Sequence, residues 1–121
     1  MNETPKNTFT VLNVKDRFDQ IVLTVCKVCE VKPTDVLSKK RPHPVACARF
    51  MVMKFCMTYI ENSTTISIGK LLNRDHSTVV VGLQRIDELI AYHADDRKVF
   101  NECEKRIRIA LGITDEPEYY I

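Results

Sequence analysis

The chain has 121 residues, of which 45% are hydrophobic and 28% charged, with three glycines and five prolines. This length and composition predict a single soluble globular domain of 1–121 and disfavour both a disordered chain and a turn-rich all-β fold. The sequence contains no run of 18 apolar residues, which excludes an ordinary membrane-spanning helix. Residues 1–10 are polar and lack the apolar segment of a secretion signal, so we expect a cytoplasmic protein.

Positive charge is concentrated in the middle of the chain, although the formal net charge is only +2. Residues 36–60 carry five basic residues and no acidic one, whereas residues 86–121 hold five basic and nine acidic residues. Taken alone, a basic run is more often a solvated surface than a binding site. The asymmetry nevertheless favours a local anionic partner, with the acidic end kept away from it.

The first half of the chain is predicted to be helical, because apolar residues recur at helical spacing. An amphipathic helix is expected over 14–30 and a short helix opened by proline over 33–38. A basic loop should follow over 39–44, where two prolines oppose helix continuation. Residues 45–61 are apolar on nearly every side, which predicts a buried central helix. Arg49 is isolated on that helix beside the basic loop, which indicates a task other than solvation.

The second half predicts three more helices. Thr64, with Ser67 three residues later, is a capping signal for a short helix that ends near Leu72. After a tight turn, Asp75 is a suitable N-cap for a long amphipathic helix.

The last helix should be capped by Asp95 or Asp96 and stopped by Gly112. The prediction is therefore an all-α, compact bundle of about six helices, folded over about 14–112, with loose tails.

A short helix, a tight turn and a longer helix form the layout of a helix-turn-helix, here at about 64–93. The longer helix opens with short side chains that carry hydrogen-bond donors and acceptors, at the positive end of the helix dipole. Such side chains can contact base edges in the major groove. They would serve equally well as plain helix caps, so spacing alone leaves both interpretations open.

The residues of this motif resemble a known family. Residues 67–79 read Ser-Ile-Gly-Lys-Leu-Leu-Asn-Arg-Asp-His-Ser-Thr-Val. This stretch is similar to the signature of the C-terminal DNA-binding domain of the bacterial replication initiator DnaA, in which Arg-Asp-His-(Ser or Thr)-Thr-Val opens the recognition helix. Upstream, residues 35–41 resemble the family's Asp-Leu-Leu-Ser-Lys followed by two basic residues. The resemblance covers about 14–112.

The resemblance implies sequence-specific binding of double-stranded DNA, in replication initiation or its regulation. In that family an arginine of the basic loop enters the minor groove, and the matching residue here is Arg41. The residues that match readers of the major groove are Asp75, His76 and Ser77. The further residues placed at or near bases and phosphates are Lys39, Lys40, His43, Arg49, Thr64, Thr65, Arg74 and Thr78.

Two features depart from the family pattern. Only Asn73 precedes Arg74 where the family carries two residues, so the turn is one residue shorter. Asparagine tolerates the left-handed backbone that such a turn needs. His43 and Cys47 stand where the family tends to carry arginine, which should weaken binding to the DNA backbone.

The sequence contains no G-x-x-x-x-G-K-[ST] phosphate loop, so a separate replication or ATPase protein would have to supply ATP-driven steps. We expect no enzymatic activity, no cofactor, no metal, no small-molecule substrate and no membrane contact. The chain resembles a free-standing relative, a fragment or a phage-like adaptor of the DNA-reading domain. A transcriptional regulator of phage or mobile-element type is the alternative within the DNA-binding class.

Two other interpretations were weighed. Cys26 and Cys29 with His43 and Cys47 imitate the spacing of a zinc site, but the first two fall inside a continuous helix, so reduced, buried thiols are favoured. The rival from another class is a helical protein-interaction module that uses apolar residues, such as those of 119–121 (Tyr119, Tyr120 and Ile121), to hold a partner.

Overall fold

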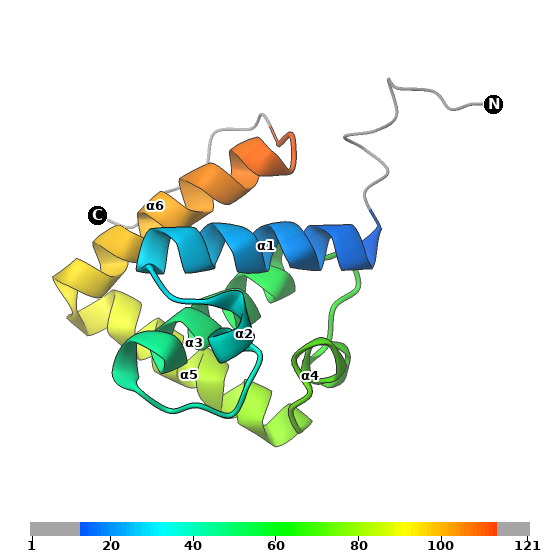
Figure 1. Ribbon diagram of the computed structural model, residues 1–121, viewed down its shortest axis with the longest axis horizontal. Helices are drawn as coiled ribbons and strands as arrows, with labels where there is room; N and C mark the ends of the chain where they lie inside the picture. The colour runs from blue at the N-terminus through cyan, green and yellow to red at the C-terminus, as the bar shows by residue number, and fades with distance from the viewer. Residues whose placement is uncertain (1–12, 114–121) are drawn as a thin grey trace.

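The computed structural model describes residues 13–113, which fold into six helices (Figure 1). The helices are α1 (Val14–Cys29), α2 (Pro33–Val36), α3 (His43–Tyr59), α4 (Thr65–Leu72), α5 (His76–Tyr92) and α6 (Ala94–Ala110). The described part holds no strand, which confirms the predicted all-α fold of about six helices. None of these helices has both the length and the hydropathy needed to cross a membrane. The predicted loose tails, including residues 119–121, lie outside the described residues.

The predicted central helix is α3, which packs against α1, α2, α4 and α5. Its side chains are buried along most of its length, as expected for a helix that is apolar on nearly every side. At its C-terminal half, Phe55 stacks on Phe100 of α6 with 4.4 Å between ring centroids. Because α6 also packs against α1 and α5, the helices enclose one apolar core around α3.

The start of α3 corrects the predicted extent of the basic loop. The helix begins at His43 rather than Val45, with Pro42 as its N-cap and Pro44 in its first turn. Proline is tolerated there because first-turn N–H groups have no acceptor within the helix. The loop between α2 and α3 therefore spans only 37–42.

The predicted cap of the last helix was wrong. One residue, His93, ends α5 and begins α6, and both Asp95 and Asp96 lie in the first turn of α6. Carboxylates are favourable at both positions, since the N-terminal end of a helix is positive throughout its first turn. The composition alone therefore did not distinguish the cap from the first turn.

The turn between α4 and α5 is tightly built. Thr64 Oγ1 accepts from the N–H of Ser67 at 3.0 Å, and the Thr64 N–H donates to Ser67 Oγ at 2.9 Å, which completes the capping box at the start of α4. At the other end Asn73 adopts the predicted left-handed conformation, with φ of 56°. The N–H of Arg74 then donates to the Gly69 carbonyl at 2.7 Å. A Cβ on Gly69 would lie 2.4 Å from the Arg74 carbonyl oxygen, so this turn requires glycine.

The recognition-type helix α5 is seated closely on α3. A Cβ on Gly82 would lie 2.3 Å from Met53 Sδ, which shows how near the two helices approach. The inner stripe of α5 consists of buried Val79, Ile86 and Ile90. This seating decides which residues at the start of α5 face outward.

Candidate nucleic-acid interface

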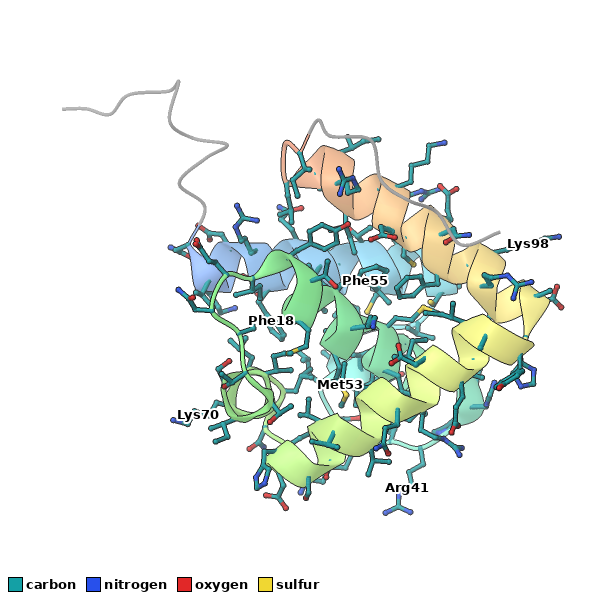
Figure 2. The ribbon with its side chains drawn as sticks, turned by 180° about the vertical axis from the view of Figure 1, so that it is seen from behind. Phe18, Arg41, Met53, Phe55, Lys70 and Lys98 are labelled. Atoms are coloured by element: carbon teal, nitrogen blue, oxygen red, sulfur yellow. The ribbon has the colours of Figure 1, made fainter. Side chains whose placement is uncertain are left out.

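The basic loop and the start of α5 face one cavity of ≈780 Å³. The loop contributes Lys39 and Arg41 to its lining, and the start of α5 contributes Asp75 and Thr78. All four residues are exposed. In Figure 2, Arg41 extends outward from the lower edge of the molecule. The fold thus brings together the two regions that the sequence marked separately.

The lining of this cavity is strongly cationic. It carries one acid, Asp75, and five basic residues, which are Lys39, Arg41, Arg49, Lys70 and Arg74. Within residues 13–113, no hydrogen bond or ion pair engages the side chains of Lys39, Arg41 or Lys70. Because an excess of positive charge attracts anions, the cavity is suited to a polyanionic ligand.

Arg49 supports the loop from beneath. Its side chain is only 6% exposed, and its Nε donates to the Val36 carbonyl at 2.7 Å. Its Nη2 donates to the carbonyls of Asp35, Ser38 and Lys40 at 3.1, 2.9 and 3.0 Å. The isolation of Arg49 on an apolar helix indicated a task other than solvation. These hydrogen bonds, which hold the loop, are such a task. Contact between Arg49 and a phosphate stays a prediction.

A second guanidinium ties the loop to the helix-turn-helix. Arg74, in the turn between α4 and α5, donates through Nη2 to the Ser38 carbonyl, which also accepts from Arg49. Burial, and next the positive charge of Arg74, lower the pKa of Arg49. Two arginines on one carbonyl therefore fix the loop relative to the start of α5.

The loop cations are not equivalent. Lys40 Nζ pairs with Asp35 Oδ1 at 3.0 Å, and the residue does not line the cavity. The unpaired Lys39 and Arg41 do line it. The structure therefore separates Lys40 from the other two predicted DNA contacts of this loop.

The residues that open α5 point their polar groups outward. Asp75 is the N-cap, as predicted, but its carboxylate accepts no hydrogen bond from the helix. His76, Ser77 and Thr78 follow it and are likewise exposed. In the described part of the chain, no side-chain hydrogen bond engages any of these four residues. Plain capping therefore does not account for these side chains.

The remaining predicted contacts, Ser77 among them, do not line the cavity. His43 lies in the first turn of α3, on the far side of the loop. Thr64 uses its hydroxyl in the capping box of α4, and Thr65 is the first residue of that helix. His76 does not line the cavity either, although it neighbours Asp75.

Six lining residues were not predicted as contacts from the sequence, which are Phe50, Gly69, Lys70, Asn73, Val81 and Gly82. Val81 lies three residues after Thr78, a spacing that places both on one side of a helix and was therefore a usable signal. Lys70 lies within the predicted helix-turn-helix but carries no local signal of a contact, and Phe50 is one of many apolar residues in α3. Nothing in the local sequence distinguishes these last two.

The cysteines behave as small apolar residues. All five are free, as predicted, and four of them are buried. Burial is the main cause that raises the pKa of Cys26 and Cys47 to about 11 and that of Cys56 to about 12, so these thiols stay protonated. Within residues 13–113, no group of three or more His, Cys, Asp or Glu side chains is arranged to hold a metal ion.

An all-α bundle with a helix-turn-helix, whose second helix opens beside a basic loop on a shared cationic cavity, defines a DNA-binding helix-turn-helix domain. Residues 18–86 match the family model described as bacterial dnaA protein helix-turn-helix. The chain belongs to this family, and the resemblance seen in its sequence is confirmed.

Relatives with curated names agree with this assignment. The chain is 30% identical over 93 residues to the chromosomal replication initiator protein DnaA of Helicobacter hepaticus, covering 77% of this chain and 20% of that protein. It is 31% identical over 90 residues to the protein of that name from Treponema denticola, covering 74% of this chain and 19% of that protein. The chain therefore spans about a fifth of the length of the relatives it matches.

Proposed function

We propose that this domain binds double-stranded DNA sequence-specifically by contacting both grooves at once. The start of α5 enters the major groove, where base edges present a distinct pattern of donors and acceptors. Arg41 enters the adjacent minor groove. One observation carries the proposal: Lys39 and Arg41 line the same cavity as Asp75 and Thr78.

The cavity between these two elements suits the DNA strand that separates the grooves. Any strand that divides a major groove from a minor groove carries phosphates, so it must pass between a loop and a helix that occupy the two grooves. The cations in the cavity can neutralise those phosphates and release their counterions, which contributes affinity without sequence preference. Base preference is then assigned to Arg41 and to the exposed side chains at 75–78.

The biological role follows from the family. The matched relatives are named chromosomal replication initiator proteins, so we place this domain in replication initiation or its regulation, at the bacterial nucleoid. The domain itself is assigned no catalytic role. The sequence has no phosphate loop, so ATP-driven steps would fall to a partner or to a segment outside this sequence.

Selection of bound duplexes from a random pool, followed by titration at several salt concentrations, tests the proposal. We expect a preferred site whose affinity falls steeply as salt rises. Arg41→Ala and His76→Ala should each lose about 1–3 kcal/mol of discrimination between the preferred and altered sites.

A protein-interaction module would behave differently in the same titration. It would show no preferred duplex and no steep loss of affinity with salt. If Arg41→Ala and His76→Ala discriminate between preferred and altered sites as well as the unaltered chain does, the assignment of Arg41 and His76 as base-reading residues is contradicted.

A further inference from the structure

A second cavity, of ≈370 Å³, adjoins the first at Arg41. It is formed between the beginning of α3 and the second half of α5. Arg41 and Phe50 line both this cavity and the larger one. Arg41 therefore lies between the two cavities, and its side chain extends outward from the molecule (Figure 2).

The second cavity also presents positive charge to solvent. Arg41 and Arg85 line it against a single acid, Glu88, together with the imidazoles of His43 and His93. Arg85 is exposed, and within the described residues no hydrogen bond or ion pair engages its side chain.

The His43 ring is held at the rim of this cavity. Its Nε2 lies 3.3 Å from Cys47 Sγ, and its Nδ1 lies 3.8 Å from the same sulfur. The contact fixes the ring at the start of α3, while the residue as a whole remains exposed. An imidazole held in this way is available to contact a group that enters the cavity.

The geometry of the minor groove indicates which part of the DNA would lie in the second cavity. The groove is about 6 Å wide and is bordered by two sugar–phosphate strands, one on each side of any side chain inserted into it. If one strand lies in the larger cavity, the other must pass on the opposite side of Arg41. That side is the second cavity.

We infer that the second cavity receives the phosphates of the opposite DNA strand, with Arg85 as the main contact and His43 beside it. This inference rests on the proposed function, since it requires Arg41 in the minor groove. The domain would then contact the phosphates of both strands that border the minor groove. Neither Arg85 nor the second half of α5 belongs to the helix-turn-helix signature in the sequence.

The test measures the affinity of the intact chain for its selected duplex after Arg85→Ala, with Arg106→Ala as the control. Arg106 carries the same charge but lies on α6, where it pairs with Glu102 at 2.6 Å. We expect Arg85→Ala to weaken binding to all duplexes alike, roughly threefold to tenfold, and to lower the salt slope by about 1. Arg106→Ala should leave both quantities unchanged. Circular dichroism and urea denaturation establish that both variants are folded.

A second measurement identifies the strand. Single phosphates on each strand are replaced by neutral methylphosphonates, and the affinity of the unaltered chain and of Arg85→Ala is compared. Neutral linkages on the opposite strand of the minor groove should weaken the unaltered chain and have little further effect on Arg85→Ala. Binding by Arg85→Ala that equals the Arg106→Ala control, or neutral linkages without effect on that strand, would overturn the inference.

These outcomes are distinct from failure of the proposed function. If Lys39→Ala weakens binding while Arg85→Ala does not, the first cavity binds DNA and only the opposite-strand contact is overturned. If the unaltered chain binds no duplex in a salt-dependent manner, the proposed function fails and the inference fails with it.

Discussion

The outer surface of α6 and the cavity beside α5 are both rich in charge, but they arrange it differently. Along α6 acidic and basic residues are interspersed, and Glu102 pairs with Arg106 at 2.6 Å. The hydroxyl of Tyr59 in α3 also donates to the carboxylate of Glu104 in α6 at 2.6 Å. In the cavity, five basic residues face a single acid.

The difference separates solvation from binding. Interspersed charges satisfy one another or water and leave little net field, whereas segregated cations create a field that a ligand can neutralise. The arginines that line the cavity also differ from one another. Arg49 donates to backbone carbonyls and so stabilises the fold, whereas in the described part of the chain Arg41 makes no side-chain hydrogen bond or ion pair.

The largest effect on stability is expected at the buried arginine, Arg49. Arg49→Met removes the donor to two carbonyls of α2, Asp35 and Val36, and to two of the loop, Ser38 and Lys40; the loss of these charge-assisted bonds should cost about 3 kcal/mol in the free energy of unfolding. Arg41→Met makes the same chemical change at an exposed position and should alter that free energy by less than about 0.5 kcal/mol. Urea denaturation of the two variants measures both values. Equal losses would show that the two arginines do not differ in this way.

An intermediate effect is expected at the turn that aims α5. Gly69→Ala would press a methyl group against the Arg74 backbone carbonyl, and we expect a loss of about 1–3 kcal/mol in the free energy of unfolding. Gly82→Ala is the matched control, since its closest contact is the flexible side chain of Met53 and alanine also favours the helix. Thermal denaturation should therefore rank Gly69→Ala as clearly less stable. The reverse order would mean that the turn can move more easily than the α3–α5 contact.

The smallest effect concerns neighbouring lysines. Lys39→Ala should weaken binding to all duplexes and lower the slope of log affinity against log salt by about 1, because it removes one phosphate contact. Lys40→Ala should leave this slope nearly unchanged, since Lys40 pairs with Asp35 outside the cavity. Titrations at a series of salt concentrations, with Lys15→Ala on α1 as the control, measure the slopes. Identical slopes for the two loop variants would show that the ion pair opens on binding.

The fold followed from the sequence because helix formation is governed by local patterns. Apolar spacing located the helices, and the left-handed turn at Asn73 could be expected from the tolerance of asparagine. The errors arose at boundaries, where one residue type suits two positions. Proline next to His43 was compatible with either a loop or a first helical turn, and Asp95 with either a cap or a first turn.

The site was only partly predictable, because its key contacts join distant segments. The sequence marked Arg41 and the start of α5, but it could not show that Ser38 accepts from both Arg49 and Arg74. It also could not show that Lys40 is paired while Lys39 is free. Such distinctions depend on which backbone carbonyl or carboxylate lies within reach, and only the packed chain decides that.

The two helices of the helix-turn-helix begin in different ways, and this has a consequence for exchange with solvent. At the start of α4 the backbone amides of Thr64 and Ser67 donate to side-chain hydroxyls in the capping box. At the start of α5 the carboxylate of the N-cap, Asp75, accepts no hydrogen bond from a backbone amide. Amide protons in the first turn of α5 should therefore exchange with deuterium rapidly in the free protein. A DNA group that accepts from these amides would slow their exchange, so hydrogen–deuterium exchange with and without duplex measures whether this turn contacts DNA.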